Sequence, residues 1–363
     1  MNSINLREGD GILMVRLGAV GDVVRTLPCL ARLREAAPRA RIAWVVEPPS
    51  SPLLPVRPWL DQVFVFPRDR LKPADIVRNP GRALTALQDF RAGLRAFRAR
   101  ISVDFQGTAK SSAIALLAGA PERLGFDRSG SREGSFLLSN LRVKPSSPRL
   151  NRVHKNLELI SLLAAETAGL RFPYRDGGPS ERVEKFLRPL SGRTLVAVHP
   201  GTSRRQRHKQ WPAERYGQIA ASLAHEGCLP ILTWGPGEED LIEIVQSRSR
   251  ASAVPTPSLD VDEMRQVIAR CRLFVGGDTG PMHLAWSQGV PVVALFGSTD
   301  PSINGPLGEG HQVLAPAWEI SSTSFPSRGD ASAVQRISVD RVRSAIVEAL
   351  SRRFVSSHEI PGR

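Results

Sequence analysis

Three short stretches of the sequence combine glycine with hydroxyl and charged side chains, as anion-binding loops do. Asp22 lies in LGAVGDVVRTLP, HPGTS at 199–203 is followed by Lys209, and GGDTGPMH covers 276–283. Glycines let the backbone approach a ligand closely, and free amides at the start of a helix attract an anion. The second and third stretches therefore predict binding sites for a phosphorylated ligand, and Lys209 adds a positive charge to the HPGTS site.

Each stretch also has a purely structural interpretation. Asp22 can be a helix N-cap that accepts backbone amides, and the two predicted phosphate sites can be ordinary strand-to-helix turns. A single histidine such as His283 is more often a core residue than a ligand-binding one. The spacing of Gly18, Gly21 and Asp22 departs from the GxGxxG fingerprint, so the first stretch does not indicate an NAD site.

Hydrophobic periodicity places these stretches at the ends of predicted strands. In the first half we expect strands at 11–17, 42–47, 62–66 and 101–107, and helices at 22–37, 82–99 and 109–118. In the second half we expect strands at 194–201, 230–235, 273–278 and 290–297, and helices at 213–226, from 238, at 260–271, 280–288 and 336–353. Ser338 is the expected N-cap of the last helix, and a loop is expected at 315–335.

The alternation of strands and helices predicts an α/β fold with two doubly wound, mostly parallel sheets in tandem. The expected domains are 1–175 and 194–335, with a Pro- and Gly-rich linker at 176–193 and a C-terminal helix and tail at 336–363. Ligands bind outside the carboxyl ends of the strands in such sheets. The polar stretches therefore lie where substrates would bind.

The bulk composition limits the classes of function. Three cysteines without CxxC spacing argue against a disulfide framework or a zinc site and favour a reducing compartment. The longest apolar runs are far shorter than the roughly 20 residues that span a bilayer, and the polar N-terminus makes a poor signal peptide, so we expect a cytoplasmic protein. The net charge of +14, with nine Arg or Lys against three acids in 65–100, favours an anionic partner, although a solvated basic face is equally compatible.

Taken together, LGAVGDVVRTLP, DFQGTAKSS, HPGTS, KQWP and GGDTGPMHLAWSQGVPVVALFGSTDP resemble glycosyltransferase family 9, the bacterial heptosyltransferases of the lipopolysaccharide core. The resemblance runs from about residue 11 to about residue 310, and DFQGTAKSS with SREGS at 131–135 is most similar to heptosyltransferase I. It implies the GT-B architecture, in which two Rossmann-like domains face a central cleft. The N-terminal domain then holds the acceptor, and the C-terminal domain holds the nucleotide sugar.

The resemblance also implies roles for individual residues. Asp22 matches the catalytic base, which takes a proton from an acceptor hydroxyl while ADP leaves from the opposite face with inversion. Lys209 matches the residue that stabilises the leaving diphosphate. The residues that match the nucleotide-sugar site are Thr202, Ser203, Lys209, Glu238, Asp278, Thr279, Gly280 and His283. Those that match the acceptor site are Gly21, Arg68, Arg70, Lys72 and Arg132.

The substrates follow from the same resemblance. The resemblance implies ADP-heptose as donor, Kdo-lipid A as acceptor, no cofactor and no metal, since the family does not depend on a metal-binding DxD motif. The positive charge would then hold the protein peripherally on the anionic cytoplasmic face of the inner membrane, at roughly 1 kcal/mol for each surface cation. No nucleic-acid partner is expected, because the basic segment 65–100 lacks interleaved stacking aromatics outside core-like positions.

Two departures from the family pattern leave alternatives open. The segment between His199 and Lys209 is long and contains RRQRHK, so Arg204 or Arg205 can take the place of Lys209. SSTSFPSRGDAS replaces a Cys-rich stretch after STDP. Another nucleotide sugar or a later core step stays possible, as does a nucleotide-sugar epimerase, which has the same architecture but needs no basic acceptor site.

Overall fold

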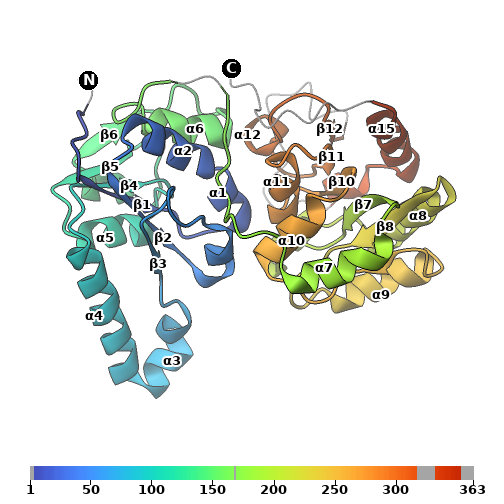
Figure 1. Ribbon diagram of the computed structural model, residues 1–363, viewed down its shortest axis with the longest axis horizontal. Coiled ribbons are helices and arrows are strands. Elements are labelled where there is room, and N and C mark those ends of the chain that lie inside the picture. The colour runs from blue at the N-terminus through green and yellow to red at the C-terminus, as the bar shows by residue number, and fades with distance from the viewer. Residues whose placement is uncertain (1–3, 167–168, 317–331, 353–363) are drawn as a thin grey trace. The chain divides into compact units, whose positions relative to one another are not determined.

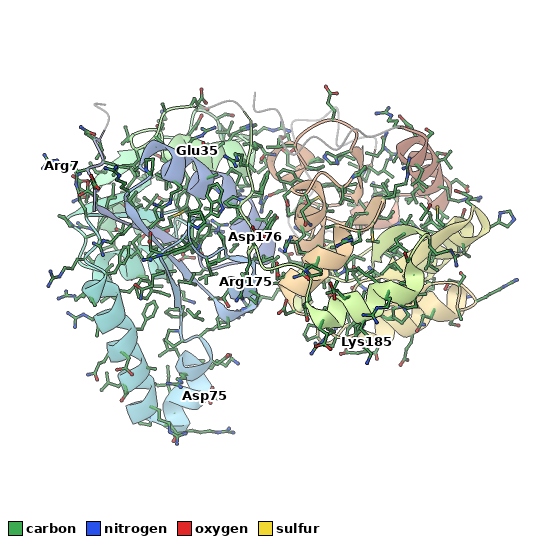
Figure 2. The ribbon with its side chains drawn as sticks, in the orientation of Figure 1. Arg7, Glu35, Asp75, Arg175, Asp176 and Lys185 are labelled. Atoms are coloured by element: carbon green, nitrogen blue, oxygen red, sulfur yellow. The ribbon has the colours of Figure 1, made fainter. Side chains whose placement is uncertain are left out.

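The computed structural model describes residues 4–166, 169–316 and 332–352. The chain forms two compact units, the first ending at Asp176, which Figure 2 labels, and the second beginning at Gly177. Residues 177–193, predicted as a linker, belong to the second unit and carry helix α7 (Glu181–Leu187) and the 3₁₀ turn η4 (Arg188–Leu190). Ser180 caps α7 and also donates from its hydroxyl to Glu263, 3.0 Å away, which fixes this segment to the second unit.

The first unit contains a sheet of six parallel strands. Their order is β3 (Gln62–Val65), β2 (Arg41–Val46), β1 (Gly11–Val15), β4 (Ile101–Asp104), β5 (Glu122–Phe126) and β6 (Leu141–Val143). Helices α2 (Leu27–Ala36) and α6 (Arg152–Leu159) lie on one face, and α4 (Pro80–Ala96) and α5 (Ala109–Leu117) on the other (Figure 1). The smaller elements are α1 (Val20–Val24), α3 (Pro73–Arg78), η1 (Pro48–Leu53), η2 (Asp69–Leu71) and η3 (Ser135–Leu138).

The second unit repeats this arrangement. Its parallel strands have the order β12 (Gln312–Leu314), β11 (Val292–Leu295), β10 (Leu273–Gly277), β7 (Thr194–His199), β8 (Cys228–Leu232) and β9 (Val254–Pro255). The remaining elements are α8 (Ala213–His225), α9 (Glu239–Arg248), α10 (Val261–Ile268), α11 (Gly280–Trp286), α12 (Pro301–Asn304), α14 (Ser332–Gln335), α15 (Val339–Ser351) and η5 (Arg204–Lys209). Counted from its own first strand, each sheet has the order 3-2-1-4-5-6 of a Rossmann fold, which confirms the predicted α/β class and its two Rossmann-like domains.

The cores follow from the strand sequences. GILMV in β1 and LFVGG in β10 are buried at every position, as expected of central strands that are covered on both faces. In the first unit, side chains of β1 and β2 pack with Phe64, Phe90 and Ile114. In the second unit, the indole of Trp211 is fully buried and donates to the Ile337 carbonyl at 2.9 Å, which joins the end of η5 to the segment before α15.

Three of the predicted elements need comment. The helix predicted at 22–37 is wrong: α1 and α2 are separated at Arg25 and Thr26, because Pro28 lacks the N–H that a continuous helix would use. The last helix is confirmed, and Ser338 accepts from the Arg341 amide at 3.2 Å as its N-cap. Of the loop predicted at 315–335, residues 317–331 lie outside the described residues and 332–335 form α14.

Candidate functional site

The predicted polar residues lie at equivalent positions in the two units. In the first sheet, strand order reverses between β1 and β4, and Asp22 follows β1 on α1. In the second sheet the reversal lies between β7 and β10, which are followed by HPGTS and GGDTGPMH. These switch points are where doubly wound sheets bind ligands.

Asp22 is held by two arginines. Its two carboxylate oxygens each lie 2.6 Å from a guanidinium, one from Arg16 and the other from Arg25. The interpretation of Asp22 as an N-cap is wrong, because Ala19 holds that position and makes no side-chain cap. Asp22 instead lies in the first turn of α1, with its side chain 28% exposed.

The charge state of Asp22 follows from these contacts. Burial alone would raise the pKa of the Asp22 carboxyl, but the guanidinium of Arg16, and after it those of Arg25 and Arg152, outweigh that effect. The pKa of Asp22 therefore lies well below the usual range of an aspartate. Asp22 is ionised at every physiological pH, and it is a weak base while both guanidiniums contact it.

Further cations surround this carboxylate. We define the Asp22 cluster as Asp22 with the five cations Arg16, Arg25, Arg132, Arg152 and Lys155. Burial, followed by the charges of Arg152, Arg16 and Arg132, lowers the pKa of Lys155 to about 8, against a smaller opposing effect from Asp127. Burial and neighbouring guanidiniums also lower the pKa of Arg152. The cluster as defined holds one acid against five bases, so its charge favours an anionic ligand over a cationic one.

The position of Lys155 is defined by contacts from the end of β5 and from the loop after it. Its ammonium donates to the Gly130 carbonyl at 2.7 Å and lies 4.3 Å from the centre of the Phe126 ring. The amide of Arg132, in the same loop, donates to the Gly107 carbonyl at 2.8 Å. One buried donor in the cluster, Arg16 Nε, has no acceptor among the described residues. An incoming anion can supply that acceptor.

The loops beneath the cluster are ordered by local hydrogen bonds. Asp104, at the end of β4, accepts from the Ser112 hydroxyl at 2.5 Å and from the Gly107 amide at 3.1 Å. Arg16 donates to the Phe105 carbonyl at 2.7 Å, which joins the loops after β1 and β4. The acid of DFQGTAKSS is therefore a loop-forming residue, and burial raises its pKa.

The structure places the predicted acceptor residues in two groups. Arg132 belongs to the Asp22 cluster, and Gly21 is buried on α1 beside Asp22. Arg68, Arg70 and Lys72 are exposed around η2, beyond the end of β3. In this second group, Arg68 forms an ion pair with Glu47 at 2.8 Å, and Lys72 forms one with Asp69 at 2.6 Å.

In the second unit, Lys209 and Asp278 form a buried ion pair. Lys209 Nζ lies 2.7 Å from Asp278 Oδ2, and the two side chains are 11% and 7% exposed. The Thr299 hydroxyl donates to the same oxygen at 2.9 Å. The long RRQRHK segment folds as η5 and does not displace Lys209 from this site. Arg205, considered as a substitute, is exposed on η5, and the placement of the Arg204 side chain lies outside what the structure describes.

His283 lies beside this pair with a defined tautomer. The Trp286 indole donates to His283 Nδ1 at 2.9 Å, and an indole N–H can only donate. When the ring is neutral its proton is therefore on Nε2, which lies 3.8 Å from Asp278 Oδ1. Both rings are buried. Trp286 and Thr299 were not expected from the sequence, because nothing in their spacing marks them as partners of the site.

Glu238 occupies the space beside Gly201. Its carboxylate accepts from the Gly235 amide at 2.7 Å, and a Cβ added at Gly201 would overlap that carboxylate. The glycine of HPGTS is thus required for close approach of an acid that follows β8. His199 is buried, donates from Nδ1 to the Thr233 carbonyl at 2.9 Å, and has its pKa lowered by burial.

The hydroxyl and amide positions complete this site. Thr202 is buried, and among the described residues its hydroxyl has no hydrogen-bond partner. Ser203 is exposed at the start of η5, while Thr279 and Gly280 lie half-buried where α11 begins. An unpartnered buried hydroxyl is costly unless a ligand or water completes it, so the Thr202 hydroxyl is available to a polar ligand.

The structure also limits other chemistries. In the part of the chain that it describes, no group of three or more His, Cys, Asp or Glu side chains is arranged to hold a metal ion. The three cysteines are free and buried. Among the described helices, none has the length and apolarity to cross a bilayer.

Comparison with known proteins gives one consistent picture. The profile of glycosyltransferase family 9 (heptosyltransferase) matches residues 88–324. The chain is 28% identical to lipopolysaccharide heptosyltransferase 1 of Escherichia coli O18:K1:H7 over 85% of this chain and 93% of that protein. It is 25% identical to lipopolysaccharide heptosyltransferase 1 of Pseudomonas aeruginosa over 88% and 89%, respectively.

Solved structures share the fold. The family 9 glycosyl transferase from Veillonella parvula superposes with a TM-score of 0.77 at 22% identity, covering 96% of this chain and 99% of that one. The E. coli heptosyltransferase WaaC with ADP superposes with a TM-score of 0.70 at 23% identity, covering 93% and 99%. At these identities the likeness concerns the fold, and it supports the predicted GT-B architecture.

Proposed function

Because the chain belongs to glycosyltransferase family 9, the heptosyltransferases, we propose that it transfers heptose from ADP-heptose to an anionic sugar of the lipopolysaccharide inner core. The observation that carries this proposal is the pair of charged sites at the two switch points. The first unit offers a carboxylate among cations, and the second offers a buried lysine and an unpartnered hydroxyl. Relatives over most of the chain's length are named lipopolysaccharide heptosyltransferase 1.

On the acceptor side, the Asp22 cluster suits a sugar that carries carboxylates, such as Kdo. A carboxylate that binds Arg16 and Lys155 satisfies Arg16 Nε and competes with Asp22 for the Arg16 guanidinium. Each guanidinium that leaves Asp22 raises the pKa of its carboxyl. The acceptor therefore makes Asp22 a stronger base as it binds, and Asp22 then takes the proton of the attacking hydroxyl.

On the donor side, a diphosphate replaces Asp278 as the partner of Lys209. The Thr202 hydroxyl can donate to the same phosphates, and the Glu238 carboxylate can accept from ribose hydroxyls. Charge that develops on the departing ADP is then stabilised by groups that are already positioned. In this proposal attack opposite the leaving group inverts the anomeric configuration, and no metal or cofactor takes part.

The acceptor in this proposal also implies a location for the enzyme. An acceptor built on lipid A is anchored in the inner membrane, so the protein acts peripherally at the cytoplasmic leaflet. The net charge of +14 supports this placement, because an anionic leaflet attracts cations at its surface.

Acceptor-dependent release of ADP tests the proposal. Purified protein is incubated with ADP-heptose, with and without deacylated Kdo-lipid A, and ADP is measured over time. Release that needs the Kdo acceptor supports transfer of the first heptose. Release only with an acceptor that already carries heptose moves the protein to a later core step, and ADP binding without turnover on either acceptor overturns the proposed substrates.

A nucleotide-sugar epimerase and a nucleic-acid-binding protein are the competing functions. An epimerase has no use for five cations around Asp22, and it would convert its nucleotide sugar without an acceptor. A nucleic-acid-binding protein would show DNA affinity that falls steeply with salt and would not bind ADP-heptose. Parallel assays of ADP release, sugar conversion and DNA binding on the same purified protein distinguish the three functions.

A further inference from the structure

Apolar side chains are exposed together at one place in the first unit. Four of the ten large hydrophobic residues that are exposed in the described chain lie within residues 76–87. On α3, Ile76 is 42% and Val77 is 82% exposed, and on α4, Leu84 is 57% and Leu87 is 37% exposed. Single exposed hydrophobics are common, but a cluster of this kind marks an interaction surface.

The helices that carry these residues form a projecting hairpin, which we define as residues 73–91. Only Asn79 separates α3 from α4, and each helix begins with a proline. Phe90 packs edge-on against Phe66 with ring centres 5.5 Å apart, which anchors the C-terminal half of α4 to the sheet. Figure 1 shows α3 and the N-terminal half of α4 standing away from that sheet, with Asp75 on α3 labelled in Figure 2.

The hairpin lies within a basic segment of the chain. Between residues 68 and 95 the chain has seven Arg or Lys against three Asp. Arg78 ends α3 and Arg82 and Arg91 lie on α4, all three exposed beside the apolar side chains. A surface that combines apolar and cationic side chains suits the boundary between anionic headgroups and acyl chains.

We propose that this hairpin docks the enzyme on an anionic lipid bilayer. Ile76, Val77 and Leu84 enter the headgroup–acyl boundary, while the hairpin arginines contact anionic headgroups. This inference rests on the proposed function, because it gives that function's lipid-borne acceptor a place to be presented. The hairpin follows η2 directly in the chain, and the predicted acceptor residues Arg68 and Lys72 lie around η2.

Charge decides between a bilayer and other occupants. A second copy of this chain would bring its own basic segment 68–95 against this one, and like charges repel. A single-stranded nucleic acid would need exposed stacking aromatics, but residues 72–89 contain none, and Phe90 is buried. An anionic bilayer satisfies the charge and the apolar side chains at the same time.

Vesicle co-sedimentation tests the docking surface. The full-length protein is mixed with vesicles of phosphatidylcholine alone or with phosphatidylglycerol added. We expect binding to the anionic vesicles, weakened by salt. Ile76→Ser/Val77→Ser should lower the partition coefficient by about tenfold or more, and Arg78→Ala/Arg82→Ala should lower it roughly fivefold for each cation removed.

Matched variants in the second unit control for general losses of hydrophobicity and charge. Val347→Ser removes an apolar side chain that is 52% exposed on α15, and Lys185→Ala/Arg193→Ala removes two exposed cations. Both control variants should bind like the wild type. All variants should keep wild-type turnover on a soluble, deacylated acceptor, since none of these residues lies in either site.

The other outcomes overturn either the docking proposal or the proposed function, and the measurements distinguish the two. Three results exclude the hairpin as the membrane surface. They are wild-type protein that does not bind anionic vesicles, hairpin variants that bind like the wild type, and equal binding to both vesicle types. Concentration-dependent self-association that the Ile76→Ser/Val77→Ser variant loses would make a second copy the occupant. Turnover on the soluble acceptor with no vesicle binding refutes docking alone, whereas vesicle binding without turnover on any core acceptor refutes the proposed function alone.

Discussion

Raising the pH from about 7 to about 9 is expected to weaken acceptor binding roughly tenfold, because Lys155 loses its proton over that interval. The pKa of Lys155 is about 8, lowered first by burial and then by the surrounding guanidiniums. An anion binds the protonated form, so affinity is highest below this pKa and falls above it. The charged neighbours that act on Lys155 are the guanidiniums of Arg152, Arg16 and Arg132 and the carboxylate of Asp127.

The size of the effect follows from the titration of one group. With a pKa of about 8, the protonated fraction falls from about 0.9 to about 0.1 between those two pH values, which is about 1.4 kcal/mol of binding free energy. Acceptor binding should also raise the pKa of Lys155. Calorimetry near pH 8 in two buffers of different ionisation enthalpy should therefore show uptake of about half a proton.

Two substitutions separate the titration of Lys155 from its size. Lys155→Arg keeps a charge that does not titrate in this range, so its acceptor affinity should be independent of pH. Lys155→Met should bind weakly at both pH values. A Lys155→Arg enzyme whose affinity still falls tenfold would show that another group titrates, and Lys155 would then have no part in acceptor binding.

Three further predictions address the remaining charged groups. Asp22→Asn should lower turnover roughly 10²–10⁴-fold while the dissociation constant of ADP, measured by calorimetry, stays unchanged; a collapse of ADP affinity would contradict the assignment of Asp22 to the acceptor. Gly201→Ala should weaken ADP binding by about 1–3 kcal/mol, and the double variant with Glu238→Ala should bind no worse than Glu238→Ala alone. Lys209→Ala should slow turnover and lower the free energy of unfolding by about 3 kcal/mol, and adding Asp278→Asn should restore stability in urea melts but not the rate.

The fold could be predicted from the sequence because the patterns that mark its strands and helices are local. Strands such as GILMV and LFVGG are dense apolar runs bounded by polar or glycine residues, and they alternate with amphipathic helices. The elements that were missed have weaker signals. β5 has the sequence ERLGF and β6 only LRV, so their pairing in the sheet, and not their own composition, makes them strands. Helix α7 in the predicted linker is likewise too short to show a clear period.

The candidate sites were only partly accessible. Sequence spacing finds Asp22, Lys209 and Asp278 because glycines and turns surround them. It does not find Arg152 or Lys155, which lie about 130 residues from Asp22 on α6. The Asn156 side-chain amide donates to the Arg25 carbonyl at 3.2 Å and the Thr26 hydroxyl at 3.0 Å, and so fixes α6 against α1 and α2. A contact of this kind depends on the folded chain and leaves no pattern in one sequence.

The two sites use buried charge in the same way. Lys209 with Asp278, and Asp22 with its two arginines, satisfy each other when no substrate is present, which avoids the cost of an unpaired buried charge. Each substrate must therefore displace an internal partner, and a neutral ligand cannot do so. A diphosphate can replace Asp278 at Lys209, and a carboxylate can replace Asp22 at Arg16. Under the proposed function, the internal ion pairs lower affinity for every ligand but select those whose charge matches, and the displaced Asp22 is the group proposed as the base.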